Sequence, residues 1–114
     1  MWVSLAIRHG PIPAEIIAAM GRQVVSGIEG ASVYLVGSYA YGKPHRHSDV
    51  DLAVIYPDEL ASTQSHVDSL ARHLCGHPEI PKDVIAIRRS RFDRLGSMRG
   101  TFSYLIRHQG VRLG

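Results

Sequence analysis

The sequence has few of the features that would place it among secreted, membrane or multidomain proteins. Its 114 residues include a single cysteine, Cys75, which excludes an intramolecular disulfide and a zinc site built from cysteines alone and fits a reducing cytosol. No apolar run approaches the roughly 18 residues of a membrane-spanning helix. The apolar segment 1–7 lacks the basic start and small-residue cleavage site of a signal peptide. We therefore expect a cytoplasmic protein without membrane contacts, in which this segment is a first strand or a docking segment.

Internal repeats, low-complexity tracts and Gly/Ser/Pro-rich linkers are also lacking. We expect one domain over residues 1–114, long enough to bury about two-thirds of its unfolded surface without disulfide support. So short a chain leaves little length beyond one core, which favours a protein that works in a complex with a partner. Trp2 is costly to leave in water, so we expect it to pack against the sheet or against a second subunit of a homo-oligomer.

Charge is distributed unevenly along the chain. Thirteen basic and ten acidic residues give a net charge of +3. Residues 1–83 carry six basic and nine acidic side chains, whereas residues 84–114 carry seven arginines and only Asp93. The acidic part is therefore expected to have a different function from the arginine-rich end. The arginine-rich end is a candidate surface for binding phosphate or a partner.

Stretches of helical and strand periodicity alternate, which indicates a fold that combines both. Apolar residues recur every three or four positions after Pro13 and predict a helix from Ala14 toward Ile28. β-Branched and aromatic runs predict three strands. The expected strands are 31–36, 49–56 and 83–87, and the expected later helices are 58–75, 92–98 and 101–109. This order favours a small α/β or α+β fold in which helices cover one sheet.

The stretch from Gly37 to Leu52, GSYAYGKPHRHSDVDL, carries the most chemistry. Gly37 ends an expected strand, and Ala40 and Gly42 predict a tight turn into a short helix. Glycine lets a backbone approach a ligand closely, Ser38 offers a hydroxyl, and the free N–H groups of such a turn point at an anion. A triphosphate tail is a natural occupant, although no Gly-Lys-Ser/Thr follows as it would in a Walker loop.

Two carboxylates, those of Asp49 and Asp51, follow at alternate positions of an expected strand, so both project from one face about 6–7 Å apart. Magnesium is the usual cation that joins such carboxylates to substrate phosphates. Asp83 heads the third expected strand and adds a third carboxylate if that strand lies beside the second. Three carboxylates over two metals would clamp both oxygens of an in-line phosphoryl displacement. Each motif alone is more often an ordinary turn or a solvated strand edge, but their joint occurrence favours a site.

Gly37-Ser38, ten intervening residues and Asp49-Val50-Asp51-Leu52 resemble the signature of the nucleotidyltransferase fold of the DNA polymerase β superfamily. The small size and the Gly-Ser-x-Ala-x-Gly form are most similar to the minimal nucleotidyltransferases, small prokaryotic proteins that are often paired with a HEPN partner. The resemblance covers nearly the whole chain. It implies a mixed β-sheet flanked by helices, and a Mg²⁺-dependent transfer of AMP from ATP to a hydroxyl with release of pyrophosphate.

The resemblance also implies roles for individual residues. Asp49, Asp51 and Asp83 would be catalytic and would bind two Mg²⁺ ions. The phosphates of the nucleotide would be held by the glycine turn and the loop after it: Gly37, Ser38, Gly42, Lys43 and Ser48. For paired members of the family the acceptor is a tyrosine of the HEPN toxin, which is adenylylated and silenced. The expected role is therefore that of an antitoxin.

Departures from the family pattern keep other interpretations open. Many relatives carry arginines where this chain has Tyr39, Tyr41 and His45, so Lys43, Arg46 or the C-terminal arginines would have to meet the phosphate charge. One alternative is therefore an inactive module that neutralises its partner by binding alone. Another is a nucleic-acid binder, which rests on the excess of arginines at the C-terminal end.

The histidine pair His45-x-His47 lies beside the aspartates. Two interpretations are open. In one the pair forms a zinc site or a phosphate contact, and in the other it lies in a solvent-exposed loop. The exposed loop is the more common situation for such a pair.

Overall fold

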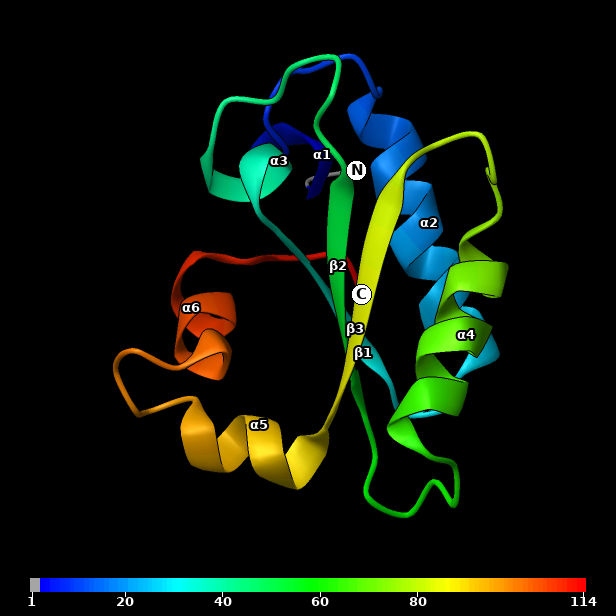
Figure 1. Cartoon of the computed structure of the whole chain (residues 1–114), viewed down its shortest axis with the longest axis vertical. Helices are drawn as coiled ribbons and strands as arrows, with labels where there is room; N and C mark the ends of the chain where they lie inside the picture. Colours follow the sequence, from blue (N-terminus) through cyan, green and yellow to red (C-terminus); the bar gives the residue numbers. More distant parts are fainter. Residues whose placement is uncertain (1–2) are drawn as a thin grey trace.

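Four strands form one mixed sheet in the computed structural model, which describes residues 3–114. β1 (Ser32–Val36) pairs antiparallel with β2 (Val50–Tyr56), and β2 pairs parallel with β3 (Lys82–Arg88). β4 (Val111–Arg112) pairs antiparallel with β1, so the order across the sheet is β3–β2–β1–β4 (Figure 1). The mixed sheet flanked by helices that the sequence predicts is therefore confirmed.

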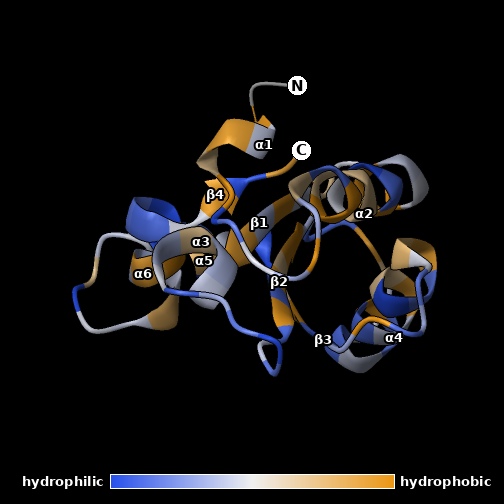
Figure 2. Ribbon diagram, turned by 90° about the horizontal axis from the view of Figure 1, so that it is seen from above, coloured by the Kyte–Doolittle hydropathy of each residue, from blue (hydrophilic) through white to orange (hydrophobic). Residues whose placement is uncertain are grey.

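Two long helices, α2 (Ala14–Gly27) and α4 (Gln64–Cys75), cover one face of the sheet (Figure 2). Thr63 caps the start of α4, because its Oγ1 accepts a hydrogen bond from the backbone N–H of His66 at 3.2 Å. None of the helices in residues 3–114 combines the length and the apolar character needed to cross a membrane. The larger core lies between these helices and the sheet, and its most deeply buried members include Ile17, Met20, Val24, Val33, Leu35, Leu52, Val54, Tyr56, Val67 and Ala86.

The other face of the sheet is covered only in part, by α5 (Arg89–Leu95), α6 (Phe102–Gln109) and the short α3 (Ser38–Tyr41) (Figures 1 and 2). A smaller core lies beneath α5 and α6 and contains Val36, Ala53, Ile55, Ile87, Phe92 and Ile106. Side chains alternate along a strand, so Ile85 of β3 lies on the same face as Ile87. Ile85 is 36% exposed, which shows that this part of β3 has no helix over it.

The bounds of several elements differ from the prediction. The described part of segment 1–7 is not a strand, because residues 3–6 form the helical turn α1 (Val3–Ala6). The expected packing of Trp2 lies outside the described residues. The helix expected from residue 58 begins at Gln64, because the guanidinium of Arg88 holds residues 58–62 as a loop through three of their carbonyls. α5 begins at residue 89 instead of 92. The two-residue strand β4 was not predicted, since it is too short to show periodicity.

Candidate functional site

The glycine turn lies where β1 ends and α3 begins. Gly37 has φ 76°, in the left-handed region that glycine tolerates best. Its carbonyl accepts hydrogen bonds from the N–H groups of Ala40 and Tyr41, both at 3.0 Å. α3 then ends at Gly42, whose N–H donates to the carbonyl of Ser38. The sequence prediction of a tight turn into a short helix is therefore confirmed.

Gly37 is also required by what lies beside it. Val36 is the register partner of Asp51 on the neighbouring strand, so the turn begins next to that carboxylate. A Cβ atom on Gly37 would collide with Oδ2 of Asp51. The backbone of the turn and the carboxylate of Asp51 are therefore in direct contact, and only glycine permits it.

Asp51 and Asp83 are register partners in the parallel pair β2–β3. Register partners on adjacent strands lie about 4.8 Å apart and point to the same face. The sequence adds Asp83 to the site only if its strand lies beside the second expected strand. The pairing of β3 with β2 meets this condition. Asp51 alternates with Leu52 and lies on the face that carries Ala53, which is the partly covered face.

The three carboxylates act on one another electrostatically. Burial raises the pKa of Asp51 above its usual value, and the negative charges of Asp83 and then Asp49 raise it further. Asp49 itself is exposed, immediately before β2. Like charges held near a half-buried carboxylate disfavour its ionised form unless a cation offsets them.

The donor set is compatible in chemistry with a hard divalent cation, because carboxylate oxygens are the ligands that Mg²⁺ prefers. As placed, however, the side chains do not converge: within residues 3–114 no group of three or more His, Cys, Asp or Glu residues is arranged so that it could hold a metal ion. A zinc site at His45 and His47, the less favoured of the two interpretations, finds no support in this arrangement either, and both histidines are exposed. A cation here would require the carboxylates to turn toward one another.

The loop between α3 and β2 carries the remaining expected residues. Lys43 is exposed, and Ser48 is half-buried. The Oγ of Ser48 accepts a hydrogen bond from the N–H of His45 at 2.9 Å, and the N–H of Ser48 donates to the carbonyl of His45 at 2.9 Å. Nδ1 of His45 in turn accepts from the N–H of His47 at 3.1 Å. The hydroxyl and the N–H of Ser48 therefore both hold its own loop together.

Tyr39 occupies a position where the family pattern carries arginine, and its side chain is fully buried. Its hydroxyl accepts a hydrogen bond from the N–H of Ile12 at 3.2 Å, and its carbonyl accepts from the N–H of Arg8 at 2.7 Å. Nε of Arg8 also reaches the carbonyl of Ala40 at 3.5 Å. Tyr39 therefore fixes segment 8–12 against α3 and brings the cation of Arg8 to that helix.

Sequence analysis did not single out Arg8, because a contact with a residue 32 positions away leaves no local pattern. It did offer the C-terminal arginines as phosphate ligands. Arg88 is the last residue of β3 and Arg89 the first of α5, so both lie at the end of β3 opposite to Asp83. Arg88 lies five positions along the strand from Asp83, roughly 16 Å at 3.3 Å per residue. These two arginines therefore lie away from the carboxylates.

Comparison with known proteins bears on this arrangement. A family model for the nucleotidyltransferase domain matches residues 15–93, which include the glycine turn and all three carboxylates. The chain belongs to the nucleotidyltransferase domain family. Members of this family generally use a nucleoside triphosphate and a divalent metal. No curated protein is similar enough in sequence to match.

A solved structure supports the fold assignment. It comes from Sulfolobus solfataricus and is described as a "putative nucleotidyltransferase"; it superposes with a TM-score of 0.53 at 18% sequence identity. The match covers 70% of each chain. At this level of identity the similarity concerns the fold alone.

Proposed function

We propose that this nucleotidyltransferase-family protein moves a nucleoside monophosphate, AMP from ATP, to a hydroxyl of a partner protein in a Mg²⁺-dependent reaction. The observation that supports this most strongly is the register of Asp51 and Asp83 on adjacent parallel strands, directly beside the backbone of Gly37. A triphosphate at the glycine turn would then have carboxylates next to its α-phosphate. Release of pyrophosphate from that phosphorus is the reaction for which such an arrangement is suited.

In this proposal the glycine turn holds the phosphates. The N–H groups of Ala40 and Tyr41 donate to the carbonyl of Gly37, so the amides of Ser38 and Tyr39 are those of the turn that would meet the anion. Ser38 adds its hydroxyl, Gly42 keeps the end of the turn narrow, and Lys43 adds an exposed positive charge. The cation of Arg8 stands in for the arginines that relatives carry within the turn. Ser48 would act by holding the loop that ends at the carboxylates.

The carboxylates of Asp49, Asp51 and Asp83 would hold the two metal ions. Bound Mg²⁺ stabilises negative charge on the phosphoryl and leaving oxygens. The acceptor hydroxyl forms the new bond to the α-phosphorus, the bond to pyrophosphate breaks, and a carboxylate takes the proton of the hydroxyl. Asp83 is our candidate for that proton acceptor, because it is exposed on β3, at the part of the face that no helix covers.

We propose a tyrosine of a HEPN toxin as the acceptor, which makes the protein an antitoxin. The resemblance in the glycine turn and the Asp-x-Asp motif supports this choice. The open face at Ile85, two residues beyond Asp83, offers an apolar surface for a protein substrate next to the carboxylates.

A binding module without catalysis is the second candidate function. It is favoured by one observation, that the carboxylates in residues 3–114 do not converge on a common metal position. Such a module would neutralise the partner through the same open face without consuming nucleotide.

The two candidates are separated by one experiment. The protein is incubated with the product of its neighbouring gene, ATP and Mg²⁺, and the intact mass of the neighbour is measured. We expect one added AMP with the wild type. We expect the same with the control variant Asp58→Asn, which removes a carboxylate at the far end of the sheet. We expect none with Asp49→Asn plus Asp51→Asn. Absence of added AMP with the wild type, or its persistence in the double variant, contradicts the catalytic proposal.

A further inference from the structure

Two arginines from distant parts of the chain meet at one buried hydroxyl. Nη2 of Arg89, at the start of α5, lies 3.0 Å from Oγ of Ser32, and Nη2 of Arg112, in β4, lies 3.2 Å from the same atom. Ser32 is the first residue of β1 and only 4% exposed. Three separate elements, β1, β4 and α5, therefore contribute to one polar cluster.

The positive charges of this cluster are not neutralised by side chains. Within residues 3–114, ion pairs at 4.0 Å or less join only His77 to Glu79 and Arg107 to Asp93. Arg112 otherwise lies over the ring of Tyr34, 6.0 Å from its centroid, and its Nε donates to the backbone oxygen of Gly114 at 3.4 Å. Two cations thus share one neutral hydroxyl oxygen.

Such an arrangement is costly unless an anion joins it. The two Nη2 atoms lie within roughly 6 Å of each other, because both contact the same oxygen, and like charges at that distance repel. Each guanidinium has five N–H donors in a fixed plane and only part of them is used here. Guanidinium groups hold tetrahedral oxyanions through paired N–H···O bonds, so the unused donors suit a phosphate group.

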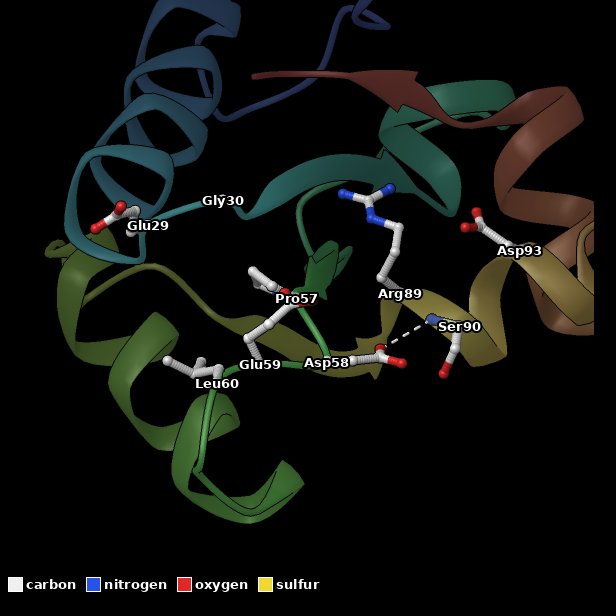
Figure 3. A pocket seen from close by; sticks show the side chains of 9 residues that line it. All are labelled: Glu29, Gly30, Pro57, Asp58, Glu59, Leu60, Arg89, Ser90 and Asp93. Carbon is white, nitrogen blue, oxygen red and sulfur yellow. Dashed lines mark hydrogen bonds between the residues drawn. The ribbon is translucent and has the colours of Figure 1, made fainter.

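A hollow of about 710 Å³ adjoins Arg89 and gives a ligand room to extend (Figure 3). Four carboxylates also line it, those of Glu29, Asp58, Glu59 and Asp93, so the part of a ligand that extends into the hollow would be neutral or positively charged. Two of the four already have partners. Asp58 accepts a hydrogen bond from the N–H of Ser90 at 3.0 Å, and Asp93 pairs with Arg107 at 3.3 Å. Figure 3 shows the side chain of Arg89 extending away from Asp58, so its guanidinium is not held by that carboxylate.

We propose that Arg89, Arg112 and Ser32 form a binding site for a phosphate group, either free orthophosphate or the phosphate of a small monoester. We call it the Arg89/Arg112 site. It is separate from the carboxylate site, because Ser32 lies four residues along β1 from Val36, the register partner of Asp51, about 13 Å at 3.3 Å per residue. The proposal does not depend on nucleotidyl transfer.

Occupation of the Arg89/Arg112 site has a structural consequence. An anion bound there would link β4 to α5 through β1, at the edge where β4 contributes only two residues to the sheet. Bound phosphate therefore stabilises the fold and slows hydrogen exchange in the C-terminal segment 111–114 more than elsewhere.

Calorimetric titration with orthophosphate at constant ionic strength tests the site. The wild type should bind with one-to-one stoichiometry, and Arg112→Gln and Ser32→Ala should weaken binding at least tenfold. Arg94→Gln removes the same charge from an exposed position on α5 and should leave the affinity unchanged. Lys43→Gln, which removes a cation beside the glycine turn, should also bind phosphate as the wild type does, which distinguishes this site from the turn proposed to hold the triphosphate.

Two further arms identify the source of the phosphate group. If the site accepts a monoester, AMP should compete with orthophosphate. Adenosine, which lacks the phosphate, should not compete. Competition by orthophosphate analogues alone would restrict the site to the free ion. Hydrogen exchange of segment 111–114 in the wild type, with and without phosphate, gives a readout that needs no variant to fold. Non-saturable binding, an equal loss in Arg94→Gln, or unchanged exchange in this segment would overturn the proposal.

Discussion

Replacement of Asp51 by asparagine should stabilise the fold while removing the proposed activity. The pKa of Asp51 is raised by burial first and then by the charges of Asp83 and Asp49. A raised pKa means that ionisation is less favourable in the folded than in the unfolded protein. The neutral amide has nearly the same shape as the carboxylate and removes that penalty.

The size of the effect follows from the strand register. Asp51 and Asp83 are paired across strands about 4.8 Å apart, and two unit charges at about 5 Å repel by about 0.8 kcal/mol in water and about 3 kcal/mol at an effective dielectric of 20. Asp83 is exposed and Asp51 half-buried, so the lower end applies. We expect Asp51→Asn to raise the free energy of unfolding at pH 7 by about 1 kcal/mol, which corresponds to a Tm higher by roughly 4 °C.

The pH dependence gives the decisive control. Below the ordinary pKa of 3.8 both states carry a neutral Asp51, so wild type and variant should be equally stable there. As pH rises through 3.8 and then through the higher folded pKa, the wild type loses stability relative to the variant, and the difference stays constant above. Urea unfolding at pH 3 and pH 7 measures both points. A variant no more stable than the wild type at pH 7, or equally more stable at both pH values, refutes the reasoning.

Asp58→Asn should behave in the opposite way. Hydrogen bonds from Ser90 lower the pKa of Asp58, with a smaller contribution from the charge of Arg88. This carboxylate therefore stabilises the fold above pH 3.8, and that stabilisation is lost as pH falls through the lower folded pKa. The variant should be less stable than the wild type at pH 7, measured by the same urea titration.

Three further substitutions test the parts around the site. Gly37→Ala should destabilise the fold by more than about 1 kcal/mol in thermal unfolding, because φ 76° is strained for alanine and its Cβ would meet Asp51; a variant as stable as the wild type would show that the turn can move. Tyr39→Arg, which introduces the arginine of the family pattern, should unfold the protein or lower its free energy of unfolding by about 3 kcal/mol or more, because the side chain is buried. Tyr39→Phe should lower the free energy of unfolding by about 1 kcal/mol through the lost hydrogen bond to Ile12. Equal effects of the two variants would contradict the burial of this side chain. Asp68→Ala should lower stability by about 1–3 kcal/mol, since its Oδ1 accepts the N–H of Ala86 at 2.6 Å on the outer edge of β3, and light scattering should show more self-association at the freed edge.

The carboxylate arrangement could be anticipated because it depends on local pattern and on one topological rule. Asp49 and Asp51 are two residues apart in the sequence. β2 and β3 are joined through a helix, a connection that usually makes two strands parallel neighbours. Once β3 lies beside β2, Asp83 at its start falls opposite the start of β2. The sequence therefore predicts the carboxylate pair, although not how far the side chains converge.

The contacts that escaped prediction are those between residues distant in sequence. Tyr39 meets Ile12 across 27 positions, and Ser32 meets Arg112 across 80. No periodicity connects such residues, since the pattern within each segment is satisfied whichever partner it finds. From the sequence alone, a tyrosine in a glycine-rich turn is expected to be exposed, as the arginine it replaces would be. Only the tertiary structure shows that Tyr39 is buried under segment 8–12.

The segments outside the family match at residues 15–93 mainly support the site, and the one cation that they would add to it is that of Arg8. Before the match, segment 8–12 packs on Tyr39 and holds α3, so the glycine turn is fixed from outside the matched region. After it, Leu113 is buried against α2, where Gly21 leaves space for its side chain, and the backbone of Leu113 extends the pairing with Val33 of β1. Both additions brace β1 and the turn that follows it, one at α3 and the other along the strand. Because Gly37 touches Asp51, a shift of β1 would move the backbone that contacts the carboxylate, and these two braces are what resist it.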